Sequence, residues 1–502
     1  NYLSNPTLTN VTFSANSAGD GGGMYNYAGS QTLINVTFDG NTAQTHGGGM
    51  YNQNTSQTLS SITFTNNSAN DSGGGLYNQM VDQTLTDLTL NNNTANIGGG
   101  MYNLISSSTL TDVTFSNNTA NRDGGGMYNE ESSPSLTDVT FSDNHAVNDG
   151  GGINNYFNSI PTLTDVTFSN NSAYKGSGIF NWDSDPILSD VIFSTNLAEF
   201  GGGIYNFTSF PSLTNITFSS NTANWAGGGL YNESSDPTLE NVTFSNNIAE
   251  NSGGAIFNET SSPPLTNVTF SGNSADYGGG IYNSVSAPIL TNVTLTLNEA
   301  EEDGGGIYNE GSVPILMNTI LWENTPDQIH NNASGSAKVT YSDIQGGWDG
   351  GGNIDKDPLL GPLADNGGLT LTHALGLGSP AIDAGNPDSY PSNDQRGETR
   401  PMDGDADGNS RCDMGAFELG YVIVTNTEGS GSVAKDPNKI EYLLGDEVIL
   451  TANPEPGWSF TGWSGDASGT DNPLTITMDA SKNITATFTQ NKQALYLPLI
   501  LR

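Results

Sequence analysis

The apolar residues of this chain recur in blocks of about 26 residues, a spacing typical of repeat proteins. Each block reads approximately P-T-L-T-N-V-T-F-S-x-N-x-A, followed by a short loop, usually three glycines, an aliphatic residue, tyrosine and asparagine. The slot of the reference phenylalanine recurs in thirteen registers, at Phe13, Phe38, Phe64, Leu90, Phe115, Phe141, Phe168, Phe193, Phe218, Phe244, Phe270, Leu295 and Leu321. Such a fixed period predicts a solenoid, in which every unit buries its apolar face against its neighbours.

The composition of each block favours strands over helices. Gly, Asn, Thr and Ser dominate, and β-branched or aromatic runs such as Val11–Phe13 suit short strands. Parallel coils stack about 4.8 Å apart, so about 12 to 13 coils would form a rod on the order of 60 Å long. We therefore predict an all-β fold: a right-handed parallel β-helix over residues 1–331, then a β-rich cap and a small C-terminal β domain.

Three further slots in the block define the cross-section of each coil. The slot after the glycines is aliphatic from Met24 onwards, and an asparagine follows two residues later, from Asn26 to Asn309. Period-2 alternation puts both on the inner side. A second asparagine series runs from Asn16 to Asn324. Stacked amides can hydrogen-bond along the axis and satisfy turn backbone groups, so we predict two asparagine ladders.

The slot between the aliphatic residue and the asparagine should face the other way, and we call its members the tyrosine row. They are Tyr25, Tyr51, Tyr77, Tyr102, Tyr128, Tyr205, Tyr231, Tyr282 and Tyr308, with Phe180 and Phe257 as substitutes and Asn154 as the one exception. We expect an aromatic surface along one outer face. It would either stabilise the rod by stacking or bind a glycan or a neighbouring rod.

The charge of the chain limits its partners. The formal net charge is −41, with only 12 Lys plus Arg, and Arg122 and Lys175 are the only basic residues of the repeat region besides histidine. Nucleic acid and anionic membrane surfaces are therefore excluded as partners, and cations are favoured. No apolar stretch is long enough to span a membrane. This composition is typical of secreted proteins from the surface of bacteria.

Two features of the chain bear on its cross-links and its start. Cys412 is the only cysteine, so the ladders rather than disulfides must stabilise the rod. Asn1 aligns with the asparagine slot of a preceding coil, and we expect the natural chain to extend further N-terminally.

The repeat blocks resemble the G-G-(A/G)-(I/L/M)-Y-N and F-x-x-N blocks of the polymorphic outer-membrane protein repeat, a family of right-handed β-helix surface proteins. The resemblance covers about two-thirds of the chain. It implies the same fold and a place on a bacterial cell surface, and it says little about biochemical activity.

The regions after the repeat resemble two other kinds of surface module. Residues 332–419 are similar to the choice-of-anchor region, and residues 420–490 to the internalin-type B repeat. The matching stretches of the first are 357–360 (DPLL), 378–385 (GSPAIDAG), 394–397 (DQRG) and 413–418 (DMGAFE), and those of the second are 445–448 (GDEV), 456–460 (PGWSF), 462–465 (GWSG) and 486–488 (ATF). The first region is expected to close the C-terminal end of the solenoid. The apolar tail, residues 491–502, would be a recognition tag or a strand that pairs with another subunit.

One loop carries the pattern of a calcium site. Its carboxylates alternate and are followed by glycine and asparagine, as in the first half of a calcium-binding loop, at Asp403, Asp405, Asp407 and Asn409. Met414 stands where a bidentate glutamate belongs, and Asp413 is the substitute we predict. The alternative is a solvated acidic turn. No other cofactor is required.

Enzymatic chemistry finds little support in the pattern. Arg122 and Lys175 lie in variable loops, acidic residues share no departure from the repeat, and the four histidines lack metal-binding spacing. We therefore expect a non-enzymatic extracellular or cell-surface structural protein, a rod that self-associates into a filament, sheath or surface layer. The alternatives are an adhesin or glycan-binding surface protein and, less favoured, a polysaccharide lyase or hydrolase. Its partners would be other copies of itself, cell-surface components or glycans.

Overall fold

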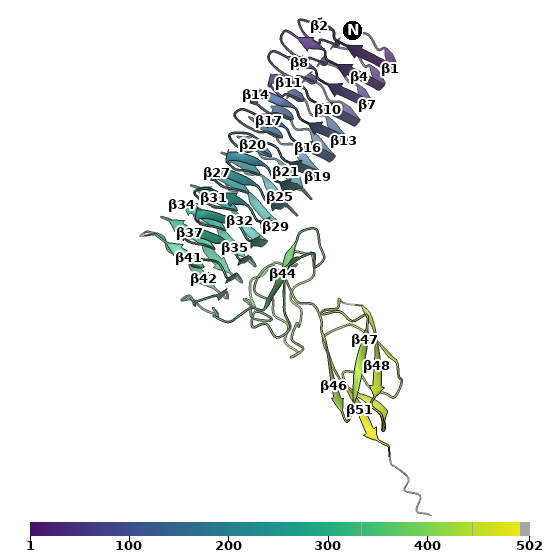
Figure 1. Cartoon of the computed structure of the whole chain (residues 1–502), viewed down its shortest axis with the longest axis vertical. Coiled ribbons are helices and arrows are strands. Elements are labelled where there is room, and N and C mark those ends of the chain that lie inside the picture. Colours follow the sequence, from purple (N-terminus) through teal and green to yellow (C-terminus); the bar gives the residue numbers. More distant parts are fainter. Residues whose placement is uncertain (333, 444, 492–502) are drawn as a thin grey trace, which may run out of the picture.

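The computed structural model describes residues 1–332, 334–443 and 445–491, and within them every regular element is a β-strand. A long rod comes first, an irregular cap lies beside its C-terminal coils, and a small β-module extends beyond the cap (Figure 1). The apolar tail predicted at residues 491–502 lies outside the described residues, apart from Asn491.

The rod is a parallel β-helix whose coils each contribute strands to three faces. The widest face is a nineteen-stranded sheet built from the T-L-x-x-V-T-F segments. Its strands are β1 (Thr7–Ser14), β4 (Thr32–Asp39), β7 (Thr58–Thr65), β10 (Thr84–Asn91), β13 (Thr109–Ser116), β16 (Ser135–Ser142), β19 (Thr162–Ser169), β21 (Ile187–Ser189), β22 (Ile192–Ser194), β25 (Ser212–Thr214), β26 (Thr217–Ser219), β29 (Thr238–Ser245), β32 (Pro264–Ser271), β35 (Ile289–Thr291), β36 (Thr294–Thr296), β39 (Ile315–Met317), β40 (Ile320–Trp322), β42 (Lys338–Thr340) and β43 (Asp343–Ile344). The rod therefore continues to Ile344, past the predicted boundary at residue 331.

The second face is a thirteen-stranded parallel sheet built from the aliphatic–Tyr–Asn segments. Its strands are β3 (Met24–Tyr27), β6 (Met50–Gln53), β9 (Leu76–Gln79), β12 (Met101–Leu104), β15 (Met127–Glu130), β18 (Ile153–Tyr156), β20 (Ile179–Trp182), β24 (Ile204–Phe207), β28 (Leu230–Glu233), β31 (Ile256–Glu259), β34 (Ile281–Ser284), β38 (Ile307–Glu310) and β41 (Ile329–Asn331).

The third face is narrow and divided into two sheets of six and five strands. The first six are β2 (Ser17–Ala18), β5 (Thr42–Ala43), β8 (Ser68–Ala69), β11 (Thr94–Ile97), β14 (Thr119–Asp123) and β17 (His145–Ala146), and the other five are β23 (Leu197–Phe200), β27 (Thr222–Ala226), β30 (Ile248–Ala249), β33 (Ser274–Tyr277) and β37 (Glu299–Asp303).

Identical side chains stack along the axis of the rod, because each coil pairs in register with the next. Phe38 and Phe64 are fully buried, and their ring centroids lie 4.9 Å apart. Both asparagine ladders form as predicted. In one of them Asn26 donates from its amide to Asn52, and Asn52 donates to Asn78, at 2.8 and 3.1 Å. Buried amides thus find their partners in the adjacent coils, which joins the coils by side-chain as well as backbone hydrogen bonds.

The cap contains one hairpin, β44 (Leu360–Ala364) with β45 (Thr372–Leu375), and otherwise irregular chain. It lies along the side of the widest sheet, not only over the end of the solenoid as predicted. Thr243 donates to the backbone oxygen of Leu371 at 2.7 Å, and Thr269 donates to the amide oxygen of Gln395 at 2.6 Å. Threonine hydroxyls that face outward from the sheet supply these bonds, so the repeat itself offers the docking surface.

The C-terminal module consists of two small sheets around its own core of buried side chains, which includes Tyr442, Trp463 and Phe488. Its strands are β46 (Ile423–Glu428), β51 (Lys482–Gln490) and β49 (Trp458–Gly465) in one sheet, and β47 (Gly431–Asp436), β48 (Glu447–Pro454) and β50 (Leu474–Thr477) in the other. Arg396 of the cap joins the two units, because its guanidinium pairs with Asp394 of the cap at 2.8 Å and with Glu441 of the module at 2.5 Å.

Candidate functional site

The tyrosine row forms two stacks of rings along the second face, separated at Asn154. The ring centroid of Tyr77 lies 4.9 Å from that of Tyr51 and 5.1 Å from that of Tyr102, and the planes of stacked rings lie within 9° of each other. The rings lie outside the central core, on the side of their strands that period-2 alternation predicts. Offset stacking of this kind stabilises neighbouring coils.

The expected exposure of this row is wrong. Tyr51, Tyr77, Tyr102, Tyr128, Tyr205, Tyr231 and Tyr308 are buried, Tyr282 is half-buried, and only Tyr25 at the first coil is exposed, at 37%. The loop that enters each strand covers them. Gly124 adopts φ +69°, and a Cβ atom there would lie 2.8 Å from Cβ of Tyr128. This glycine allows the backbone to pass directly over the aromatic side chain, which closes the ring off from solvent.

The tyrosine hydroxyls reach the coil that follows. Tyr231 donates to the carboxylate of Glu259 at 2.8 Å, Tyr102 donates to Glu130, and Tyr51 donates to the amide oxygen of Gln79 at 2.9 Å. Burial raises the pKa of Tyr51 to about 12. The row is therefore an internal support that combines stacking with hydrogen bonds, and its rings do not form the predicted outer contact surface.

Only two carboxylates of the predicted calcium site lie together in the structure, and a third joins them from outside the predicted loop. Asp403 and Asp405 come together with Asp383, and one oxygen of each lies within 4.8 Å of the others. Asp407 instead accepts hydrogen bonds from the backbone nitrogen and the amide of Asn409, at 2.8 and 3.1 Å. The three clustered carboxylates can hold a calcium ion, because oxygen ligands are the ones it takes.

Asp413 is a correction to the predicted ligand set. Its carboxylate is fully buried and accepts hydrogen bonds from the backbone nitrogens of Asp383 and Leu419, both at 2.7 Å. It positions Asp383 instead of facing the cluster. Burial and the neighbouring Asp405 and Asp403 raise the pKa of Asp383 to about 6, although hydrogen bonds from the backbone of Arg411 and Gly404 oppose the shift. The sequence signal for Asp383 was its place in the G-S-P-A-I-D-A-G stretch.

Family comparisons agree with this geometry. The family described as "Right handed beta helix region" matches residues 76–244 and again residues 157–325. The chain is a right-handed parallel β-helix repeat protein. Residues 61–79 match the Chlamydia polymorphic membrane protein repeat, and residues 421–492 match the divergent InlB B-repeat domain. The resemblances to the polymorphic membrane protein repeat and to the internalin-type B repeat are thereby confirmed. The comparison with curated proteins finds no match.

Together these matches indicate a surface-type repeat protein. The choice-of-anchor resemblance of residues 332–419 stays a prediction. Among the described residues there is no helix that is long and apolar enough to cross a membrane.

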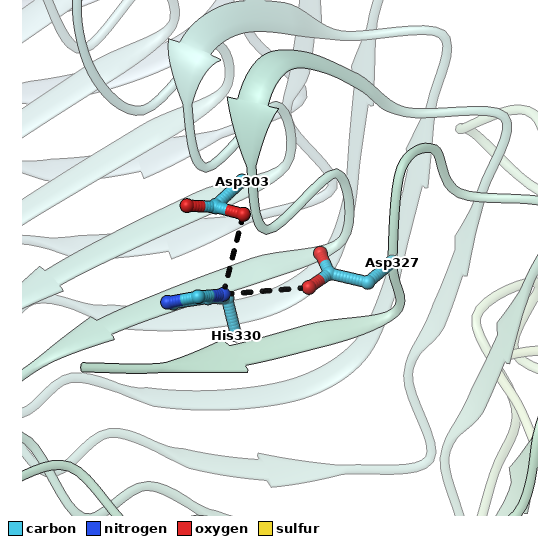
Figure 2. A group of neighbouring side chains, drawn as sticks. All are labelled: Asp303, Asp327 and His330. Atoms are coloured by element: carbon cyan, nitrogen blue, oxygen red, sulfur yellow. Dashed lines mark ion pairs between the residues drawn. The ribbon is translucent and has the colours of Figure 1, made fainter. Parts of the chain in front are cut away.

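A second group of possible metal ligands lies at the C-terminal end of the β-helix. Nδ1 of His330 lies 3.5 Å from a carboxylate oxygen of Asp303 and 3.5 Å from one of Asp327 (Figure 2). His330 occupies the tyrosine slot of its coil and stacks on Tyr308 at 5.0 Å. This group was not among the sites predicted from the sequence, where the four histidines lack the usual metal-binding spacing. The signal was the D-x-x-H spacing of residues 327–330 at the end of the tyrosine row.

The departures from the repeat also come together, contrary to the expectation that they are isolated. Asn154, the exception in the tyrosine row, lines a cavity with Arg122, Asp123 and Asp149. Lys175 pairs with Asp149 in a parallel bridge. The sequence contained the signal, since the two basic residues and the missing ring fall in consecutive coils of the β-helix.

Proposed function

We propose that this β-helix protein is a non-enzymatic extracellular structural protein of a bacterial surface, a rod that associates with copies of itself. The observation that carries the proposal is the continuity of axial bonding: phenylalanine stacks, tyrosine stacks and two asparagine ladders run through successive coils. Such bonding gives a stiff, protease-resistant rod without disulfides. The Chlamydia polymorphic membrane protein repeat and the B-repeat match support a bacterial surface location.

Charge sets the conditions for association. A net charge of −41 makes rods repel each other over about the Debye length, roughly 8 Å at physiological ionic strength. Divalent cations would reduce this repulsion. The carboxylates of Asp383, Asp403 and Asp405 supply a calcium site in the cap, and the exposed acidic side chains supply weaker sites along the rod. We therefore propose that assembly depends on calcium.

Electron microscopy and light scattering of the purified chain test this proposal, with calcium chloride, with magnesium chloride and with a chelator. Filaments, sheets or bundles are expected with calcium and dispersed rods with the chelator. Dispersed monomers at high protein concentration in every condition would refute self-association. Release of reducing or unsaturated sugars from acidic polysaccharides would refute the non-enzymatic assignment.

The alternative function is that of an adhesin or glycan-binding surface protein. Burial of the tyrosine row removes the contact surface on which that reading first rested. A different observation supports it. Large aromatic side chains stand exposed in the middle of the rod, at Tyr174, Trp182, Phe210 and Trp225. Such exposed aromatic side chains are candidates for a contact role.

A further inference from the structure

One coil of the β-helix has no ring in the tyrosine row. Asn154 of β18 pairs in register with Tyr128 on one side and Phe180 on the other. Elsewhere the rings of adjacent coils touch, as between Tyr205 and Tyr231 at 4.7 Å. An asparagine side chain is too short to fill this step. A cavity of about 340 Å³ results, a volume within the usual range of small-molecule sites.

The amide of Asn154 is buried in this cavity and incompletely bonded. The whole residue is only 3% exposed. Nδ2 makes one long hydrogen bond, at 3.4 Å, to the backbone oxygen of Asp149. Oδ1 has no hydrogen-bond partner among the residues that the structure describes. Buried acceptors are nearly always paired, so this oxygen is poised to accept a hydrogen bond from a ligand.

Charged groups of both signs surround the same cavity. Arg122 and Lys175 lie one coil to either side of Asn148, whose backbone nitrogen donates to Arg122 and whose oxygen accepts from Lys175, at 2.8 and 2.9 Å. The guanidinium of Arg122 lies 3.4 Å from the carboxylate of Asp123. No other lysine or arginine occurs in residues 1–331. Arg122 lines the cavity and supplies a hydrogen-bond donor beside these acceptors, whereas the ammonium of Lys175 donates to the hydroxyl of Tyr205 at 3.2 Å.

The carboxyls of the cavity are held in a dry environment. Burial raises the pKa of Asp123, and it raises the pKa of Asp149 to about 6, with the charge of Asp123 adding to the shift and Lys175 and Arg122 opposing it. Both carboxyls can accept hydrogen bonds from hydroxyl groups of a ligand.

Aromatic side chains form the outer wall of the cavity. Tyr156 and Trp182 occupy the slot that holds Glu130 and Glu233 in other coils. Their rings meet edge to face at 5.4 Å, and Trp182 is 43% exposed. A partly exposed indole beside a polar pocket suits a ligand that is apolar on one face and hydroxylated at its edge.

We propose that this cavity binds an uncharged pyranose unit of a glycan. The C–H face of the sugar packs on Trp182, while its hydroxyls donate to Asn154 Oδ1 and to the carboxylates of Asp123 and Asp149 and accept from Arg122. Uronic acids are disfavoured, because the two carboxylates and the net charge of −41 repel them. This inference goes beyond the proposed structural function and does not depend on self-association.

Immobilised oligosaccharides that carry hexose, N-acetylhexosamine or uronic acid units test the proposal with the full chain, followed by calorimetric titration of any that bind. Retention of an uncharged oligosaccharide is expected. Asn154→Tyr restores the ring that the other coils have and fills the cavity, so it should raise Kd by about tenfold or more without lowering the thermal stability. Trp182→Ala should raise Kd in the same direction, and it covers the case in which the tyrosine variant does not fold.

Tyr2→Ala is the control, because it removes an exposed aromatic side chain near the N-terminus, outside the cavity, and should leave Kd unchanged. The proposal is overturned if no uncharged oligosaccharide is retained, or if folded Asn154→Tyr and Trp182→Ala both bind with the Kd of the unmodified chain. It is also overturned if uronic acid oligosaccharides alone are retained.

Discussion

Removing one amide from an asparagine ladder is the sharpest test of how this rod is held together. Asn118 is buried between two neighbours of its ladder. Its side-chain oxygen accepts from the backbone nitrogen of Asn93 at 3.1 Å and from the amide of Asn93 at 3.0 Å. Its own amide donates to the backbone oxygen of Leu90 at 2.8 Å and to Asn144 at 3.0 Å. Asn118→Ala removes all four hydrogen bonds at once.

The cost of that substitution follows from what it leaves behind. Each buried hydrogen bond contributes about 1 kcal/mol net, so four are worth about 4 kcal/mol. The backbone N–H of Asn93 then stays buried without an acceptor, which adds about 1–2 kcal/mol. We expect the free energy of unfolding to fall by about 5–6 kcal/mol, a large part of the 5–15 kcal/mol that is typical of a domain.

Asn117→Gly is the control for this substitution. Asn117 is the exposed neighbour with φ +54°, where glycine keeps the left-handed turn, and the change should stay within about 0.5 kcal/mol. Guanidinium denaturation followed by circular dichroism gives the global effect. Amide hydrogen exchange shows whether loss of protection is centred on the coils that contain residues 90–144, as expected when each coil contacts only its neighbours. The reasoning is refuted if the two variants unfold within about 1 kcal/mol of each other.

Three further predictions follow from the cap and the tyrosine row. Calcium should raise the melting temperature at pH 7 but not below about pH 5, because burial raises the pKa of Asp383 to about 6 and protonation removes a ligand. Asp383→Asn should abolish this calcium-dependent shift of the melting temperature. An equal shift in that variant would contradict the site. Arg396→Met should destabilise the cap by about 3–5 kcal/mol, since it leaves the buried carboxylate of Asp394 unpaired. Limited proteolysis should then cleave the chain near residue 420. Lys338→Met, which changes an exposed lysine, should leave the proteolysis pattern unchanged. Stability should fall as pH rises above 10, because burial raises the pKa of Tyr51 to about 12 and the tyrosines of the unfolded chain ionise first. Alkaline titration followed by tyrosinate absorbance checks this. Ionisation of all tyrosines near pH 10 in the folded chain would contradict it.

The repeat made most of the fold predictable. One slot recurs thirteen times, and this recurrence specifies which residues of adjacent coils pair. Parallel coils in register place Phe38 against Phe64, and no other register pairs the equivalent residues of every block. The inward side of Phe38 and Asn52 follows from alternation along a strand. The end of the rod was less predictable, since its last coils up to Ile344 have lost the repeat sequence while they keep the strand pairing.

Exposure of the tyrosine row could not be deduced from alternation. Alternation fixes the side of the strand on which Tyr128 lies, and that prediction is correct. It carries no information about what the variable loop does after it leaves the third face. The loop folds back at Gly124 and covers the ring, and the residues that cover other rings, such as Ile97 and Phe200, belong to the variable part of the block. In the sequence, the glycine triplet indicated only that the backbone passes close to another group, and not that this group is the tyrosine ring.

The calcium cluster illustrates a different limit. The alternation of Asp403 and Asp405 is a local pattern, and a local pattern can identify ligands that are close in sequence. Asp383 joins them from twenty residues earlier through a turn held by Asp413. Irregular chain has no period from which such a contact could be inferred. Asp413 was predicted as a ligand, whereas it accepts a hydrogen bond from the backbone of Asp383.

A repeat also gives physical meaning to its own departures. A ring in the tyrosine row is supported by a stacked neighbour on each side, so replacing one by Asn154 forfeits two stacking contacts of about 0.5–1.5 kcal/mol each. The loss is not compensated locally, since the amide oxygen gains no hydrogen bond among the described residues. Arg122, the only arginine of residues 1–331, and the exposed Trp182 line the same cavity as Asn154. Unfavourable changes that converge on one cavity are better explained by a ligand that offsets them than by independent drift. Asn154→Tyr separates these two explanations. Both predict that the variant stabilises the rod, but only the ligand explanation predicts that it abolishes binding.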